Sequence, residues 1–229
     1  MNRSLRTLVL PAALASVLAV SACGSTAGTP GTAGTPAPDM GGMSQSSTTA
    51  ASAGKPASGP HSDADVAFAT GMVPHHAQAV QMADMALGQA TKPEIKTLAT
   101  EIKASQNPEI QTMSGWLVGW GKPVPTPGGS DMSGMGGSTG EPMGGMMSPK
   151  DMSDLGKATG TAFDRMWLQM VTKHHRGAIT MAQTELSQGQ NPDAKKLAQT
   201  IIDGQTKEVT QMTGILATLQ LNGQPTATG

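Results

Sequence analysis

The stretch PHHAQAVQMA, residues 74–83, decides the fold because it returns as KHHRGAITMA, residues 173–182. Each stretch holds a histidine doublet that is followed by Met-Ala at the same distance. The offset of 99 positions between His75 and His174 also superposes, without a gap, Asp65 on Asp164, Pro93 on Pro192, Gln106 on Gln205, Glu109 on Glu208 and Met113 on Met212. The chain therefore contains two copies of one unit.

Both copies carry apolar residues at helical spacing, and turn residues interrupt the pattern at Gly88, at Lys92-Pro93 and from Gly189 to Pro192. The pattern predicts helices over residues 63–88, 93–120, 158–188 and 192–220, and no strand. A single helix hairpin is too small to bury its own apolar face. We therefore expect an all-α fold in which the two hairpins pack as one four-helix bundle with approximate two-fold symmetry.

The regions outside the copies have a different composition. Residues 24–60 are rich in Gly, Ala, Ser, Thr and Pro, which is typical of a disordered tether. A Gly- and Met-rich segment separates the copies. We divide the chain into a leader over 1–22, a tether over 23–60, a bundle over 61–220 and a tail over 221–229; within the bundle, repeats over 62–120 and 158–220 flank a linker over 121–157.

The leader has the features of an export signal. Arg3 and Arg6 precede an apolar run from Leu8 to Val20, and the run ends in a lipobox-like Val-Ser-Ala-Cys23. These features predict an exported chain that is lipidated on Cys23 and held at the outer face of a membrane or in the periplasm. Cys23 is the only cysteine, so an intrachain disulfide is impossible. The net charge of -1 gives no reason to expect a nucleic-acid partner.

Polar residues interrupt the apolar stripes at the middle of all four predicted helices. His75, His76, His174 and His175 are four of the five histidines in the chain. Gln106, Glu109, Gln205 and Glu208 hold the corresponding places on the second helix of each hairpin. Burying these groups costs several kcal/mol each unless they are paired or metal-bound. A bound cation resolves that cost, so we interpret the four histidines as metal ligands, against the alternative of a hydrogen-bonded core.

Methionine and glutamate complete the candidate ligand set. Met72 precedes the first doublet by one turn, and Val171 stands at the equivalent place in the second copy, which predicts two unequal halves. The further candidates are Met82, Met113, Met181, Met212, Glu109 and Glu208. Imidazole suits copper, zinc and iron, whereas a thioether selects Cu(I), so this inventory favours copper as Cu(I) or Cu(II). Iron and zinc stay alternatives, although the Glu-x-x-His pairs of di-iron bundles are missing from the sequence.

Methionines also recur outside the helices, as Met40-x-x-Met43, Met132-x-x-Met135 and Met143-Gly-Gly-Met146-Met147. This spacing resembles the Met-x-x-Met arrays of extracytoplasmic copper proteins. Two interpretations stay open at this point: a copper-collecting segment, or a small-residue linker that contains methionine incidentally.

The doublets with their Met-Ala pairs, together with Gln106-Asn-Pro-Glu109-Ile-Gln-Thr-Met113 and Gln205-Thr-Lys-Glu208-Val-Thr-Gln-Met212, resemble the DUF305 family over nearly all of residues 62–220. The resemblance implies a ferritin-like four-helix bundle. Members of the CopM type are periplasmic copper binders that lower the toxicity of excess metal. The resemblance therefore implies ligands at His75, His76, His174 and His175, with Met72, Met82 and Met181 as soft partners.

The sequence thus predicts a lipid-anchored protein that binds copper and is not an enzyme. No serine, cysteine or carboxylate dyad is arranged for nucleophilic or acid-base catalysis, and the sequence has no phosphate-binding glycine loop. The alternatives are a di-iron or copper redox enzyme, which would need Glu109 and Glu208 as ligands, and a metal-free helical interaction module. A homodimer is also possible, because two chains can associate as the two copies do.

Overall fold

The computed structural model describes residues 59–126 and 143–221, and everything within these ranges that is regular is helical. The elements are α1 (Asp63–Gln89), α2 (Pro93–Gly119), the short 3-10 turn η2 (Met143–Gly145), α3 (Pro149–Lys157), α4 (Gly160–Gln188) and α5 (Pro192–Leu221). The four long helices match the predicted ones to within two residues at each end. The predicted leader, the lipidation site Cys23, most of the tether and the tail lie outside the described residues.

The helix starts follow local rules of capping. The Ser62 side chain accepts a hydrogen bond from the backbone of Asp65, whose carboxylate accepts one from the Ser62 backbone at 2.6 Å, so α1 begins with a capping box. Pro93 and Pro192 occupy the first positions of α2 and α5, where a missing N–H costs nothing. No helix in the described ranges has the length and apolarity needed to span a membrane.

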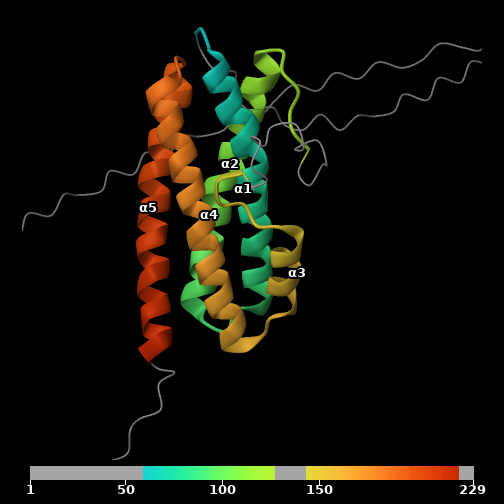
Figure 1. Ribbon diagram of the computed structural model, residues 1–229, viewed down its shortest axis with the longest axis vertical. Helices are drawn as coiled ribbons and strands as arrows, with labels where there is room; N and C mark the ends of the chain where they lie inside the picture. Colours follow the sequence, from blue (N-terminus) through green and yellow to red (C-terminus); the bar gives the residue numbers. More distant parts are fainter. Residues whose placement is uncertain (1–58, 127–142, 222–229) are drawn as a thin grey trace, which may run out of the picture. The chain divides into compact units, whose positions relative to one another are not determined.

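The long helices form two hairpins that pack face to face (Figure 1). α1 packs along α2, α4 packs along α5, and the two hairpins meet mainly through α1 and α4, whereas α2 and α5 touch only lightly. This arrangement confirms the predicted all-α four-helix bundle built from two repeated hairpins.

The apolar core is divided into two clusters. The turn-1 cluster surrounds the end of the bundle that carries the α1–α2 turn, and the turn-2 cluster surrounds the end that carries the α4–α5 turn. The turn-1 cluster includes Met82, Ile95, Ile102, Phe163, Trp167 and Met212, and the turn-2 cluster includes Phe68, Met72, Met113, Trp116, Leu117 and Ile201. Each cluster contains residues from the start of one hairpin and from the turn of the other. The helices α1 and α4 therefore run antiparallel.

Two buried aspartates fix this crossed arrangement. Asp164, at the start of α4, accepts hydrogen bonds from the backbone N–H (3.0 Å) and the hydroxyl of Thr91 in the α1–α2 turn. Asp65, its counterpart at the start of α1, accepts from the backbone N–H groups of Gln190 (3.1 Å) and Asn191 (2.8 Å) in the α4–α5 turn. Each hairpin therefore binds the turn of the other. Both aspartates therefore act at helix starts and not at the histidine doublets.

The segment predicted as a linker over 121–157 ends in a helix of nine residues, α3, which the sequence pattern did not predict. Ser148 caps α3 and forms a capping box with Asp151, and Pro149 opens the first turn. Leu155 is fully buried and belongs to the turn-1 cluster. α3 was missed because it is only nine residues long, with Met152 and Leu155 as its apolar anchors, and it follows a glycine-rich stretch.

Candidate metal centre

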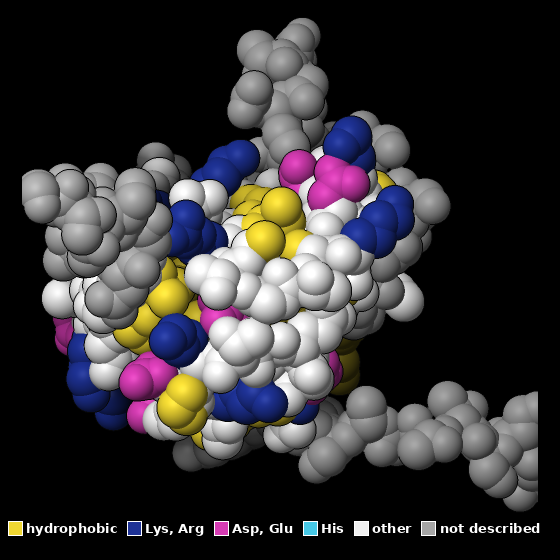
Figure 2. Space-filling model, turned by 90° about the horizontal axis from the view of Figure 1, so that it is seen from below, with side chains coloured by type: hydrophobic (Ala, Val, Ile, Leu, Met, Phe, Trp, Pro, Cys, Tyr) yellow, Lys and Arg dark blue, Asp and Glu magenta, His cyan; other side chains and the backbone are white. Residues whose placement is uncertain are grey.

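Between the two apolar clusters lies a polar layer, here called the histidine layer. All four doublet histidines are at most 1% exposed, and Gln106 and Gln205 are also buried. The eight members are His75, His76, Gln106, Glu109, His174, His175, Gln205 and Glu208. No histidine side chain is visible in the view of Figure 2, where apolar and charged side chains are scattered among other polar ones. As predicted, these residues gather at mid-height of the bundle.

Two of the histidines are held by carboxylates in the same way. His76 Nε2 lies 2.8 Å from Glu109 Oε2, and His175 Nε2 lies 2.7 Å from Glu208 Oε2. The side chains of Glu109 and Glu208 are 14% and 12% exposed, so each carboxylate stands between a buried ring and the solvent. The two pairs are related by the internal repeat. Each pair fixes one ring with its Nε2 atom toward the surface.

The other two histidines meet at the centre of the layer. The rings of His75 and His174 are 3.8 Å apart between centroids and tilted by 38°. His75 Nε2 lies 2.9 Å from the carbonyl oxygen of Gly144 in η2, whereas neither ring nitrogen of His174 has a hydrogen-bond partner. Among the described residues, no backbone carbonyl plays the same part for His174. The contact with Gly144 therefore breaks the two-fold symmetry of the layer.

The remaining ring nitrogens are buried and unpaired. Nδ1 of all four histidines lacks a hydrogen-bond partner, and so do both side-chain polar atoms of Gln106. A buried polar group without a partner costs about 1–3 kcal/mol. The Nδ1 atoms of the layer thus carry lone pairs that no hydrogen bond within the described residues uses. A metal ion could accept these lone pairs.

The charge state of the central pair suits metal binding. Burial, the largest cause, lowers the pKa of His75 to about 3, while the hydrogen bond to Gly144 acts against this shift and the neighbouring histidines add to it. Burial also lowers the pKa of His174 well below its ordinary value, and the nearby histidines contribute. Both rings are therefore neutral at physiological pH, the form in which imidazole coordinates a metal.

The structure brings the predicted methionines to the layer's two flanks. Met72 and Met113 lie in the turn-2 cluster and Met82 and Met212 in the turn-1 cluster, all four fully buried, whereas Met181 is only partly buried. The Met212 sulfur accepts a hydrogen bond from the Thr172 hydroxyl at 3.7 Å. Val171 is buried at the place equivalent to Met72. The thioether supply is therefore unequal between the halves.

Within the described residues, no group of three or more His, Cys, Asp or Glu side chains already surrounds a point that could hold a metal. The glutamates contact the histidines and not a common centre. A metal site here therefore needs a rotation of the unrestrained His174 ring, or a thioether, to complete the ligand set. Ligation by Glu109 and Glu208 stays a prediction, as does ligation by the methionines.

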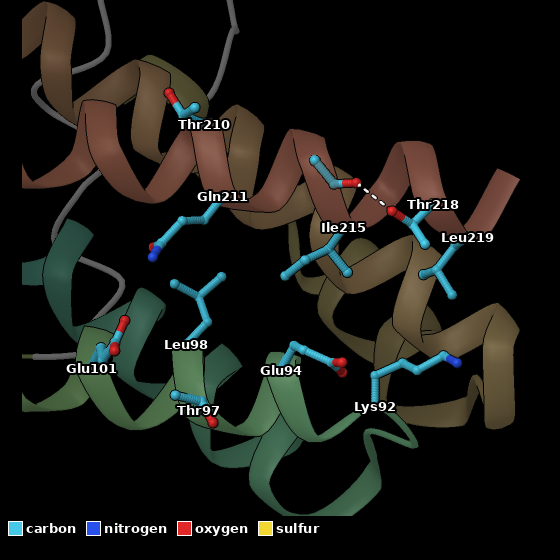
Figure 3. A pocket seen from close by; sticks show the side chains of 11 residues that line it. Lys92, Glu94, Thr97, Leu98, Glu101, Thr210, Gln211, Ile215, Thr218 and Leu219 are labelled. Carbon is cyan, nitrogen blue, oxygen red and sulfur yellow. Dashed lines mark hydrogen bonds between the residues drawn. The ribbon is translucent and has the colours of Figure 1, made fainter. Parts of the chain in front are cut away.

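A separate groove of about 600 Å³ lies between α2 and α5, away from the histidine layer. Leu98 of α2 faces Ile215 and Leu219 of α5 across it, with Glu94 and Glu101 along one side (Figure 3). Ile215 and Leu219 stand where the first repeat has Trp116 and Trp120. The smaller side chains and the light contact between α2 and α5 account for the groove.

The fifth histidine, His61, packs against Trp120. The ring of His61 stacks on Trp120, with centroids 4.6 Å apart and an angle of 13° between the planes. His61 therefore packs at one end of the bundle and does not join the histidine layer.

The fold and the site together define a class of protein: a duplicated helix-hairpin bundle with a buried layer of histidines across its middle. The chain belongs to the DUF305 family, the "domain of unknown function (DUF305)", whose profile matches residues 65–216. No curated protein matches the sequence.

Several solved structures have the same fold. A DUF305 protein from Streptomyces coelicolor, described as a candidate secreted protein, is 32% identical over 69% of this chain and 94% of its own, with a TM-score of 0.61. A DUF305 fragment from Deinococcus radiodurans is 28% identical over 69% and 99%, with a TM-score of 0.60. CopM in the Cu(II)-bound form is 34% identical over 67% and 96%, with a TM-score of 0.57. CopM also matches in Cu(I)-bound and Ag-bound forms.

Proposed function

We propose that this chain binds copper outside the cytoplasm and holds it, which lowers the concentration of the free ion. The observation that carries the proposal is the set of four buried, unpaired Nδ1 atoms in one polar layer between two apolar clusters. The Cu(I)-bound and Cu(II)-bound forms of CopM, a relative with the same fold, support copper as the ion.

The hydrogen bonds of the layer assign a role to each residue. Histidines that bind a metal through one ring nitrogen commonly donate the other N–H to a carboxylate or a carbonyl, which fixes the tautomer and the ring orientation. His76 and His175 have this arrangement with Glu109 and Glu208. In our proposal these glutamates are positioning residues, and the metal is bound by Nδ1 of the histidines.

The thioethers select the oxidation state. Met72 and Met82 flank the first doublet from opposite clusters, and a thioether binds Cu(I) in preference to harder ions. Because the site has no thiolate and its central rings are neutral, the His75 and His174 rings would not neutralise the positive charge of a bound Cu(I). Glu109 and Glu208 at the rim would compensate this charge.

Export and anchoring belong to the same proposal. The leader and the lipobox at Cys23 would place the bundle on the outer side of a membrane, with residues 24–60 as the tether. The Streptomyces coelicolor relative, a candidate secreted protein, supports export. The chain would act by binding and not by catalysis.

Competition titrations of the purified full chain with Cu(I), Cu(II) and Zn(II) test the proposal. We expect the highest affinity for Cu(I), and a loss of at least about 100-fold when His75 and His174 are both changed to Ala. His61→Ala is the matched control, since His61 lies outside the layer, and should leave the affinity unchanged. Unaltered affinity in the double variant, or no binding of any of the three ions, would refute copper binding by this layer.

The double substitution Glu109→Gln with Glu208→Gln separates copper binding from the di-iron alternative. A glutamine oxygen can still accept the Nε2 proton of each histidine, so a copper site should keep its affinity within about tenfold. A di-iron site would lose the carboxylates that hold it and release its metal. Iron retained in the wild type and lost in this variant would favour the redox enzyme.

A further inference from the structure

The Met143–Met147 segment lies across the seam between α1 and α4 at the level of the histidine layer (Figure 1). The backbone carbonyl of Gly144 accepts a hydrogen bond from His75 Nε2 at 2.9 Å. One helical turn further along α1, the Gln78 side chain makes two hydrogen bonds to the backbone of Met147, accepting from its N–H at 2.7 Å and donating to its carbonyl at 2.9 Å. The segment thus runs along α1 from the doublet to the next turn.

Glycines on both sides allow this close approach. A Cβ atom at Gly177 of α4 would lie 1.6 Å from the Gly144 oxygen, and one at Gly145 would lie 2.6 Å from the carbonyl of Lys173. Gly145 also has a φ of 86°, which a residue with a side chain rarely adopts. Gly177 stands in the second repeat at the place of Gln78 in the first. One copy therefore holds the segment by hydrogen bonds, and the other makes room for it.

The carbonyl of Gly144 does for His75 what Glu109 and Glu208 do for His76 and His175. In all three cases an acceptor at the rim holds Nε2, and Nδ1 is left unpaired in the interior. The segment thus supplies the third member of one set of orienting acceptors.

We propose that the Met143–Met147 segment is a metal-responsive clasp, which orients His75 for coordination through Nδ1 and which closes more tightly when a soft monovalent cation occupies that atom. Coordination withdraws electron density from the imidazole, so the Nε2–H group becomes a stronger donor to the Gly144 carbonyl. The tighter hydrogen bond stabilises the segment on α1. This inference rests on the proposed metal-binding function and adds a reporter of metal occupancy to it.

Hydrogen exchange of residues 144–148 in the full chain, with and without Ag(I), measures the clasp directly. Ag(I) is a redox-inert probe with the same preference for imidazole and thioether ligands as Cu(I). We expect slower exchange at the Met147 amide in the Ag(I)-loaded protein, by about fivefold or more, because opening of the clasp becomes less frequent. Unchanged or faster exchange would overturn the proposal.

Gly177→Ala displaces the clasp without touching a histidine. Alanine suits the helix, but its Cβ occupies the position of the Gly144 oxygen. We expect rapid exchange at residues 144–148 with or without Ag(I), an affinity for Ag(I) about 10-fold to 100-fold lower, and loss of the fixed Nε2–H tautomer of His75 in nitrogen NMR spectra. Gly204→Ala on α5, where a Cβ would meet nothing within 4 Å, is the matched control and should behave as the wild type.

Gln78→Leu provides a second displacement, and circular dichroism verifies that each variant is folded. Wild-type affinity together with a fixed His75 tautomer in both Gly177→Ala and Gln78→Leu would refute the clasp. If the wild type binds no Ag(I), the proposed function fails together with the clasp. If binding depends on the histidines but the exchange of residues 144–148 does not respond, the clasp alone fails.

Discussion

Replacing Glu185 by glutamine should remove a large part of the pH dependence of stability. Glu185 lies on α4, is 1% exposed and faces Asp65. Burial, which is the largest cause, together with the hydrogen bond and the charge of Asp65 raises the pKa of Glu185 from 4.5 to about 8. Lys195 acts in the opposite direction. Glu185 is therefore protonated in the folded protein at neutral pH.

The sign of the effect follows from this raised pKa. A carboxyl group whose folded pKa exceeds its unfolded value contributes stability that is present below the unfolded value and is lost as the pH rises through the folded one. For values of 4.5 and about 8, the free energy of unfolding should fall by about 3 kcal/mol between about pH 5.5 and about pH 9. Asp65, whose pKa is lowered because its hydrogen bonds outweigh the effect of burial, loses its contribution only in acid, outside this window.

Urea unfolding at the two pH values, followed by circular dichroism, measures the effect as the difference between wild type and Glu185→Gln. His75 and His174 have lowered pKa values and so gain stability as the pH rises through about 6.5, but they contribute equally to both proteins and cancel. The glutamine amide can still donate a hydrogen bond to Asp65. A difference that stays constant within about 0.5 kcal/mol from pH 5.5 to 9 would refute the assignment of a buried, protonated Glu185.

Three further substitutions test the packing around the layer. Trp167→Phe removes the buried hydrogen bond from the indole N–H to the Met82 carbonyl (2.8 Å) and should cost about 1–3 kcal/mol in urea unfolding. Asp164→Ala leaves the α1–α2 turn without its acceptor and should lower the free energy of unfolding by about 2 kcal/mol or more. Met72→Leu should change stability by less than about 1.5 kcal/mol and weaken Cu(I) binding about tenfold in competition titrations, whereas Met85→Leu should leave binding unchanged.

The repeat explains how much of the fold could be predicted. An offset of 99 positions that preserves turns, apolar stripes and mid-helix polar residues fixes two hairpins of equal length. Residues at the middle of equal hairpins lie at one height whichever way the hairpins pack, so the histidine layer followed from the sequence. The antiparallel order of α1 and α4 did not follow. It depends on Asp65 and Asp164 binding the opposite turns, and each of these hydrogen bonds joins residues more than 70 positions apart.

The roles of the single groups in the layer were harder to predict. A glutamate beside a histidine at helical spacing is compatible with direct ligation and with orientation of the ring, and only the Nε2 contacts of Glu109 and Glu208 distinguish them. Gly144 was missed because a backbone carbonyl leaves no signal in the side chains. Gln78 and Gly177 differ in the repeat alignment, and that difference between two otherwise matched stretches is the signal that could have indicated an asymmetric contact.

The asymmetry of the layer bears on how a buried site can admit an ion. A site in which all four rings were held equally would be rigid, and a metal could enter only by breaking several buried hydrogen bonds at once. In this protein three rings are held at Nε2 and His174 is held at neither nitrogen. Since the His174 ring lies 3.8 Å from the oriented His75 ring and has no hydrogen bond to break, its rotation toward an incoming ion would leave the other rings in place. The duplication thus provides four ligands, and the single clasp on one copy leaves the equivalent ligand of the other copy able to move.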